Sequence, residues 1–188
     1  MSQESVEVVR QPIRISDGSH RRLEEQIAVR FPNLAVAVMR VLIRLPARSR
    51  VRRLLLSRTV RLGVEASNRG DYEVAFVLFH PDMEYLAPTD TVVLGTFPER
   101  LQGRRERIEF ERGWRGDWGE FRYEPDELID LRDQLLLIGR MVGSGRTSGA
   151  ATESEWAALY TISRGQVIRE QIFFDDNTEA LKAVGLAE

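Results

Sequence analysis

The sequence predicts an α+β domain in which helices lie on one face of a curved antiparallel sheet. Helical patterns fill most of the first half of the chain, and strand patterns follow one another through the second half. A tight turn, Ser163-Arg164-Gly165-Gln166, joins the last two predicted strands. Helices followed by strands in antiparallel succession are typical of α+β folds.

Three helices are predicted before residue 70. The first follows Ser16 or Ser19 and runs to Arg30, since serine is a good helix cap. The second covers Asn33–Leu45, and Pro32 suits its first turn while Pro46 stops it. The third runs from about Arg48 to Asn68 and ends before Gly70, and its apolar residues recur at three- and four-residue spacing.

The predicted elements after residue 70 follow one another more closely than those before it. A short helix, Tyr72–Leu78, follows Asp71, whose side chain can cap it. The corner His80-Pro81-Asp82 leads into a strand, Met83–Ala87, and Thr89–Pro98 is a loop or a short extended piece. The remaining predicted elements are, in order, a helix Glu99–Trp118, strands Phe121–Leu131, Leu135–Ser144, Glu155–Ile162 and Val167–Asp175, and a helix Asn177–Val184. The glycines in 143–149 indicate a strand bend rather than a phosphate-binding loop.

The register of the last hairpin decides which side chains share a face. Gly165 suits a two-residue loop because glycine takes positive φ without steric cost. With Arg164 and Gly165 as the loop, Ile162 faces Val167, Ala158 faces Gln171 and Trp156 faces Phe173. One face then carries Trp156, Ala158, Tyr160, Arg169, Gln171, Phe173 and Asp175, and the other Ala157, Leu159, Thr161, Ile168, Glu170, Ile172 and Phe174. Neither face is plainly polar, so we expect both to be covered.

Composition excludes several kinds of site. The chain of 188 residues has no cysteine, which rules out disulfides, thiolate metal sites and cysteine nucleophiles. His20 and His80 are the only histidines, so we do not expect a multi-histidine metal centre. We expect no cofactor. No signal peptide is visible, and the most apolar run, Leu34–Leu45, is shorter than the roughly 20 residues of a membrane-spanning helix. We therefore expect a soluble, cytoplasmic protein.

Charge is distributed unevenly along the chain. Residues 1–62 hold 13 arginines against five acidic residues, a net charge of +8, although the whole chain has a net charge of −2. In the stretch 32–62, the arginines alternate with Val, Leu and Ile. Such a helix can pack or make an oligomer contact, which we favour, or it can lie on an anionic membrane surface. Nucleic acid fits least, because the interleaved residues are aliphatic.

Five stretches together resemble a known family. They are 63–71 (GVEASNRGD), 80–85 (HPDMEY), 121–128 (FRYEPDEL), 160–167 (YTISRGQV) and 179–186 (EALKAVGL). In this order they resemble the SnoaL-like branch of the nuclear transport factor 2-like fold, which includes polyketide cyclases, ketosteroid isomerase and limonene epoxide hydrolase. The resemblance implies a cone-shaped, bent antiparallel sheet wrapped on helices, an apolar pocket at its open end, and a homodimer. It covers residues 59–186, so we expect a SnoaL-like domain at 59–188 and an added helical extension at 1–58.

The resemblance places an acid–base carboxylate in the last strand, and Asp175 is the matching candidate. Aromatic neighbours would disfavour its charged form and raise its pKa towards a value useful for proton transfer. Alternatively, Asp175 or Asp176 caps the final helix. In the catalytic reading, Tyr85 or Tyr160 would donate a hydrogen bond to a developing oxyanion, and Arg140 would assist electrostatically.

Two departures from the family pattern weaken the catalytic reading. The epoxide hydrolase pattern has an Asp two residues after the Arg, where this chain has Val142, and many members have a histidine where this chain has Ala158. Glu170 lies mid-strand among apolar residues, so it is either catalytic or, as we favour, paired with an arginine such as Arg140.

Aromatic residues supply the candidate pocket walls. The proposed ligand-binding residues are Trp114, Trp118, Trp156, Tyr160, Gln171 and Phe173. For most of the aromatics, however, we favour a place in the core or in a dimer interface. The sequence thus favours a protein that binds an apolar small molecule and that, if it is an enzyme, carries out cofactor-free isomerase, cyclase or hydrolase chemistry. The alternative is a non-catalytic ligand-binding or dimerisation module, which residues 32–62 could hold at a membrane surface.

Overall fold

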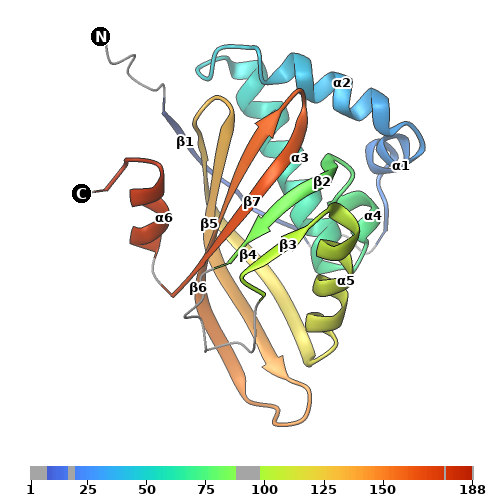
Figure 1. Ribbon diagram of the computed structural model, residues 1–188, viewed down its shortest axis with the longest axis vertical. Coiled ribbons are helices and arrows are strands. Elements are labelled where there is room, and N and C mark those ends of the chain that lie inside the picture. Colours follow the sequence, from blue (N-terminus) through green and yellow to red (C-terminus); the bar gives the residue numbers. More distant parts are fainter. Residues whose placement is uncertain (1–7, 17–19, 88–97, 176, 188) are drawn as a thin grey trace.

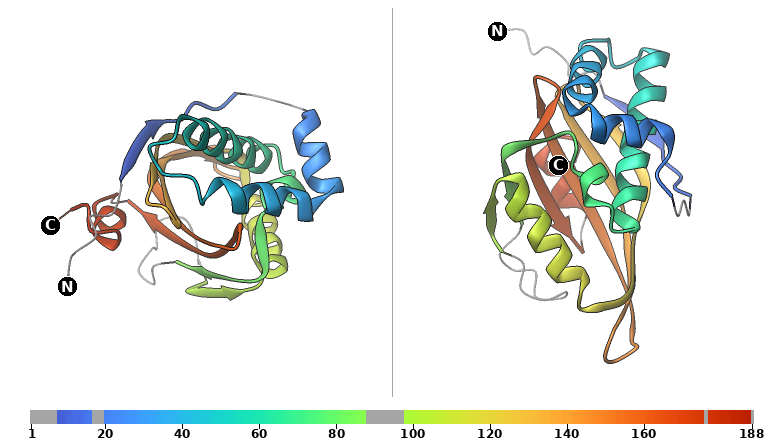
Figure 2. Two further views of the ribbon diagram at one scale, coloured as in Figure 1. Left: turned by 90° about the horizontal axis from the view of Figure 1, so that it is seen from above. Right: turned by 90° about the vertical axis from the view of Figure 1, so that its right-hand side faces the viewer.

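A computed structural model describes residues 8–16, 20–87, 98–175 and 177–187 (Figure 1). Seven strands form one sheet in the order β1-β4-β5-β6-β7-β2-β3, with antiparallel pairing except between β2 and β7. The sheet is strongly curved and unclosed, and helices lie against its concave side (Figure 2). This arrangement confirms the predicted α+β fold.

The helices and strands occupy most of the described chain. The helices are α1 (Leu23–Arg30), α2 (Pro32–Leu42), α3 (Arg50–Asn68), α4 (Tyr72–Ala75), α5 (Arg104–Arg115) and α6 (Asn177–Ala183). The strands are β1 (Val9–Pro12), β2 (Phe79–Leu86), β3 (Arg100–Gln102), β4 (Trp118–Asp130), β5 (Gln134–Gly145), β6 (Ala151–Ser163) and β7 (Gln166–Phe174). The predicted loop at 89–98 lies almost wholly outside the described residues.

Several boundaries differ from the predictions. The second helix ends at Leu42 rather than Leu45, α4 ends at Ala75 rather than Leu78, and three further differences change the sheet. The polar start of the chain contains β1, which adds to the sheet beside β4. The predicted helix Glu99–Trp118 is instead the short strand β3 followed by α5, and Trp118 begins β4 after Gly116. The expected corner at His80-Pro81-Asp82 lies within β2, where the pairing with β7 is interrupted between Phe79 and Glu84. That interruption accommodates Pro81, which has no N–H to donate to a ladder.

A bulge changes the register of the β6–β7 hairpin. Ile162 faces Val167 as predicted, and both Arg164 and Gly165 have positive φ, +52° and +84°. The ladder then shifts between Thr161 and Ile162, because Ile168 is an extra residue on β7. The pairs predicted beyond the bulge are therefore wrong by one residue: Ala158 faces Ile172, and Trp156 faces Phe174.

The bulge also exchanges the faces of β7. Tyr160 faces Glu170, so Glu170, Ile172 and Phe174 point to the concave side together with Trp156. Gln171 and Phe173 lie on the opposite, convex side, across from Leu159 and Ala157. The predicted grouping of Gln171 and Phe173 with Trp156 is therefore wrong, since one inserted residue inverts the alternation of side chains.

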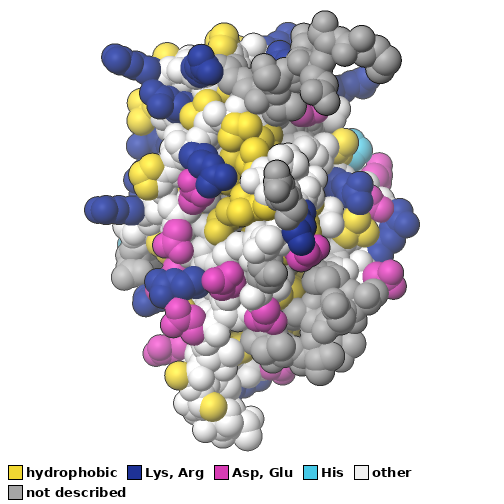
Figure 3. All heavy atoms as spheres, turned by 90° about the vertical axis from the view of Figure 1, so that its left-hand side faces the viewer, with side chains coloured by type: hydrophobic (Ala, Val, Ile, Leu, Met, Phe, Trp, Pro, Cys, Tyr) yellow, Lys and Arg dark blue, Asp and Glu magenta, His cyan; other side chains and the backbone are white. Residues whose placement is uncertain are grey.

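Both faces of the sheet are covered. On the concave side, one large hydrophobic core joins the strands to α2, α3 and the α4 region through residues such as Leu56, Phe76 and Leu137. On the convex side, a smaller core packs Ala180 of α6 against Leu136 and Leu159. Figure 3 views the face of the molecule that carries α6 and shows hydrophobic side chains at its centre, bordered by charges of both signs.

A buried ion pair attaches α3 to the sheet. Arg52 donates from Nε and Nη2 to Oδ2 and Oδ1 of Asp130 at 2.7 and 2.6 Å, and both side chains are buried. Arg52 also donates to the carbonyl oxygens of Ile43, Leu45 and Arg132. The proposed boundary between residues 58 and 59 falls inside α3, downstream of this anchor.

Candidate functional site

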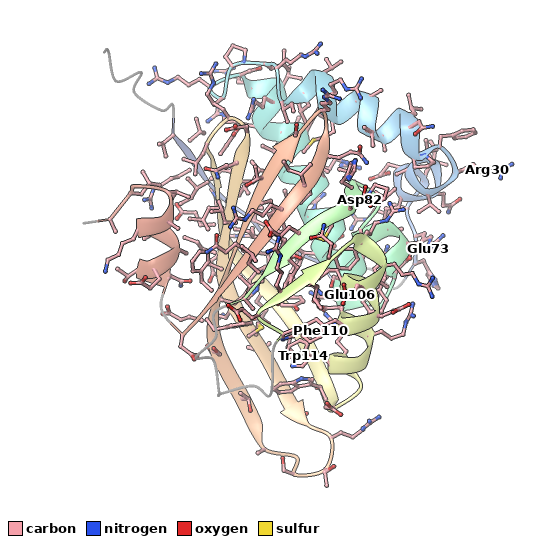
Figure 4. The ribbon with its side chains drawn as sticks, in the orientation of Figure 1. Arg30, Glu73, Asp82, Glu106, Phe110 and Trp114 are labelled. Atoms are coloured by element: carbon pink, nitrogen blue, oxygen red, sulfur yellow. The ribbon has the colours of Figure 1, made fainter. Side chains whose placement is uncertain are left out.

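A cavity of about 420 Å³ lies between the concave side of the sheet and the helices. Its wall is mostly apolar, with contributions from α1, α2, α3, the α4 region, α5 and strands β2 and β4–β7. Phe110 of α5 lines it, and Trp114 lies one turn further along the same helix (Figure 4). A mostly apolar hollow with a few polar groups is the usual form of a small-molecule site.

One buried polar network borders the cavity and is here called the Arg107 cluster: Arg107, Glu111, Arg115, Tyr123, Tyr160 and Glu170. Arg107 donates from Nε to Glu170 Oε2 at 2.7 Å and from Nη1 to Glu111 Oε2 at 2.8 Å. Arg115 donates to the other oxygen of Glu111 at 3.1 Å, and the Tyr123 hydroxyl donates to that oxygen at 3.1 Å. Glu111 thus has two arginine partners.

The two carboxylates differ in their electrostatic surroundings. Burial raises the pKa of Glu170 above its usual value, and the opposing charge of Arg107, with hydrogen bonds from Arg107 and Tyr160, offsets this only in part. Burial also acts on Glu111, but there the combined charges of Arg107 and Arg115 prevail and hold its pKa below the usual value. The cluster therefore contains one firmly ionised carboxylate and one, Glu170, whose proton is held more tightly.

Tyr85 of β2 faces the same cavity. Its ring centroid lies 4.7 Å from the guanidinium carbon of Arg107, which is within cation–π range. Burial raises the pKa of the Tyr85 hydroxyl well above its usual value, so the hydroxyl keeps its proton. No hydrogen bond to this hydroxyl is found within the described part of the chain, so its donor is available to a ligand.

The structure places Asp175 and Arg140 away from the cavity. Asp175 is exposed, has a φ of +61°, and accepts a hydrogen bond from the Ser154 hydroxyl at 2.5 Å. Arg140 is 46% exposed and pairs with Glu153 at 2.7 Å and with Glu124 at 3.3 Å. The buried partner of Glu170 is therefore Arg107 rather than Arg140. Asp176, the alternative cap of the last helix, lies outside the described residues.

The predicted aromatic and polar walls divide into three groups. Trp156 and Tyr160 line the cavity. Trp114 and Trp118 belong to an aromatic cluster with Phe121, at ring distances of 4.6–5.6 Å, beside a second hollow between α5 and the β5–β6 end. Gln171 and Phe173 lie on the convex side, where Phe173 packs near α6.

Sequence reasoning missed Arg107 and Glu111. The helix prediction rests on apolar residues such as Phe110 and Trp114 and assigns no role to the charged residues between them. The signal was nevertheless present, because Arg107, Phe110, Glu111 and Trp114 follow the three- and four-residue spacing of one helical face. Two charges on the apolar face of a helix indicate a buried ionic network.

Other kinds of site receive no support from the described residues. No group of three or more His, Asp or Glu side chains there is arranged to hold a metal ion. None of the helices in the described ranges is long and apolar enough to cross a membrane. The homodimer and the cytoplasmic location stay predictions.

A curved, unclosed sheet that wraps helices around an apolar cavity defines a nuclear transport factor 2-like protein. Within that class, residues 60–170 match the family described as the SnoaL-like domain. The chain belongs to this family, which confirms the resemblance found in the sequence. No curated protein sequence matches the chain.

Solved structures share this fold at low sequence identity. A candidate SnoaL-like polyketide cyclase from Jannaschia sp. CCS1 is 17% identical with a TM-score of 0.56, and the match covers 76% of this chain and 99% of that one. TerC, co-crystallised with polyporic acid, is 21% identical with a TM-score of 0.53, over 67% of this chain and 94% of that one. A candidate isomerase from Bacillus subtilis is 13% identical with a TM-score of 0.51, over 69% and 92%. These similarities concern the fold alone.

Proposed function

We propose that this protein binds an apolar small molecule in the 420 Å³ cavity and moves a proton on it through Glu170, without a cofactor. The observation that carries the proposal is a buried carboxyl with a raised pKa in the wall of an apolar cavity. A raised pKa makes a carboxylate a stronger base, which helps it to accept a proton from a ligand and return it. Structural neighbours described as a polyketide cyclase and an isomerase support the same reaction class.

The residues around Glu170 suit a carbonyl compound with an acidic C–H bond. Glu170 would accept the proton from that carbon, and the C–H electron pair would form an enolate. The free donor of Tyr85 would stabilise the enolate oxygen by a hydrogen bond, since preorganised donors act most strongly where charge develops. Glu170 would then return the proton to another carbon, which completes an isomerisation with no net change in atoms.

The test uses a β,γ-unsaturated cyclic ketone as the probe and follows its conversion to the conjugated isomer by ultraviolet absorbance. We expect turnover by the wild-type protein, at least about 100-fold loss in Glu170→Gln, a typical size for a general-base contribution, and a smaller loss in Tyr85→Phe. Asp175→Asn, which changes a carboxylate outside the cavity, is the matched control and should keep full activity. Loss of turnover in Asp175→Asn but not in Glu170→Gln would return the catalytic role to Asp175.

A non-catalytic ligand-binding protein is the second candidate. It is favoured by the pairing of Arg107 with both Glu170 and Glu111, because a fully paired network can serve stability alone. Native mass spectrometry of the protein from its own host distinguishes the two functions. A bound compound recovered chemically unchanged after long incubation with both wild type and Glu170→Gln would support this second function.

A further inference from the structure

Exposed apolar side chains are concentrated on α1–α3. Nine of the eleven large hydrophobic residues exposed in the described chain lie in or directly beside these helices. They are Leu23, Ile27, Phe31, Leu34, Val38, Val41, Val51, Leu54 and Leu55, here called the apolar helical surface. An exposed apolar patch of this kind marks an interaction site.

The apolar helical surface follows helical periodicity. On α2, Leu34, Val38 and Val41 recur at spacings of four and three, while Met39 and Leu42 on an adjacent side are buried in the core. Val51, Leu54 and Leu55 form a similar stripe on α3, where Leu54 is 72% exposed. Both helices thus bury one apolar side and present a second to the outside, which packing within this chain does not explain.

Positive charge surrounds this surface. Residues 30–64 contain nine arginines and no acidic residue. Arg44 follows Val41 by three residues, and Arg50 precedes Leu54 by four. Each of these two exposed arginines therefore lies about one turn from an exposed apolar side chain. Arg44 and Arg50 have no ion pair within the described part of the chain. Figure 3 shows basic side chains at the upper end of the molecule, next to hydrophobic ones.

The cavity opens through the same surface. Ile27, Leu34, Val38 and Leu55 are exposed, yet they also line the cavity whose inner wall holds Glu170. Figure 2 shows α2 running across the end of the curved sheet, between α3 and β7. A continuous apolar path therefore leads from the outside of α1–α3 into the cavity.

We propose that the apolar helical surface docks on an anionic lipid bilayer, so that the cavity exchanges its apolar ligand with the membrane interior. Basic helices with an exposed apolar stripe bind at such interfaces through both burial and charge. A second copy of the chain fits less well, because a two-fold interface would oppose two arginine-rich surfaces, whose α2 and α3 parts contain no acidic residue between positions 30 and 64. The cavity mouth favours lipid over an acidic protein partner, since an apolar ligand needs an apolar route.

The absence of cysteine from the chain makes the test direct. Leu54→Cys carries an environment-sensitive fluorophore at the proposed contact, and Arg105→Cys carries it on α5, where the side chain is 92% exposed. With phosphatidylglycerol-containing vesicles at low salt, we expect a blue shift at position 54 and none at position 105. Phosphatidylcholine vesicles should give neither shift, and high salt should weaken the binding because it screens charge.

Charge variants give a quantitative second measurement by vesicle co-sedimentation. Loss of one arginine near an anionic surface weakens binding about 5-fold, so the pair Arg44→Gln and Arg50→Gln should weaken it about 25-fold. The pair Arg105→Gln and Arg122→Gln removes the same charge from exposed positions outside α1–α3 and should leave binding unchanged. Equal effects of the two pairs would overturn the proposal.

Two further outcomes would also overturn it. One is the absence of a shift at position 54 with every vesicle composition while sedimentation shows a monomer. The other is a fluorophore already shielded without vesicles in a protein of twice the monomer mass, which would assign the surface to a second copy of the chain.

Discussion

Replacing Arg107 by methionine tests whether the Arg107 cluster is held together by charge. Methionine keeps much of the length and the contacts to Phe76 and Tyr85 but removes the positive charge. Glu111 keeps Arg115 as a partner, whereas Glu170 loses the cation 2.7 Å away and has no other ion pair within the described residues. The loss of folding stability should therefore come mainly from Glu170, which is left buried without a counter-charge.

The size of the effect follows from the proton that Glu170 must take up. Protonating a carboxyl with an ordinary value of 4.5 at pH 7 costs about 3.4 kcal/mol, at 1.36 kcal/mol per unit of pH. Breaking a buried ion pair by removing one partner costs about 3–5 kcal/mol, which agrees with this figure. In a chain of this size, we expect Tm to fall by about 6–20 °C at pH 7.

Urea unfolding, followed by tryptophan fluorescence at pH 5 and pH 7, measures this loss. The destabilisation should be smaller at pH 5, because the protonation of Glu170 there costs only about 0.7 kcal/mol. The double variant Arg107→Met with Glu170→Gln should recover most of the loss at pH 7, since a neutral carboxamide needs no counter-charge. A double variant as unstable as Arg107→Met alone, with the same stability at both pH values, would refute this reasoning.

Three other variants test separate features of the structure. Arg52→Met should lower the free energy of unfolding by about 3–5 kcal/mol in urea, because Asp130 loses its only buried cation partner among the described residues; an effect below 1 kcal/mol would contradict the anchoring role. Gly165→Ala should cost more than about 1 kcal/mol and speed amide exchange in α2, since φ at this position is +84° and the new methyl group would meet the Val36 carbonyl; unchanged exchange would show that the turn does not hold the helix. The raised pKa of Glu170 means that the folded state binds its proton more tightly, so wild-type stability should fall relative to Glu170→Gln as pH rises from 4.5 through the folded-state pKa; parallel stability curves would exclude such a shift.

The general architecture could be predicted because it depends on local signals. Gly70 and Gly165 occur where the structure has positive φ, and the third helix ends at the predicted Asn68. The order of helices and strands, with the five matching stretches, then indicated the family. Such signals act within a few residues, so one sequence suffices to read them.

The candidate site could not be predicted in the same way, because it depends on one inserted residue. Strict alternation from the turn puts Gln171 and Phe173 with Trp156, whereas the bulge at Ile168 puts Glu170 and Phe174 there. Nothing in the stretch 166–169 distinguishes a bulge from regular pairing, since the extra residue is an ordinary isoleucine. The proposed role of Asp175 and the favoured pairing of Glu170 with Arg140 both depended on that alternation.

The ion pair between Arg52 and Asp130 ties the N-terminal helices to the sheet, which limits whether they can be removed or replaced. Arg52 lies before the start of the family match at residue 60, but Asp130, its partner, lies at the end of β4. Glu65 is likewise buried and accepts hydrogen bonds from Ser16. Trimming the chain to the matched region would remove the Arg52 cation from Asp130 and the Ser16 donors from Glu65. The first helices and the sheet should therefore unfold in a single transition and be inherited together rather than recombined as separate modules.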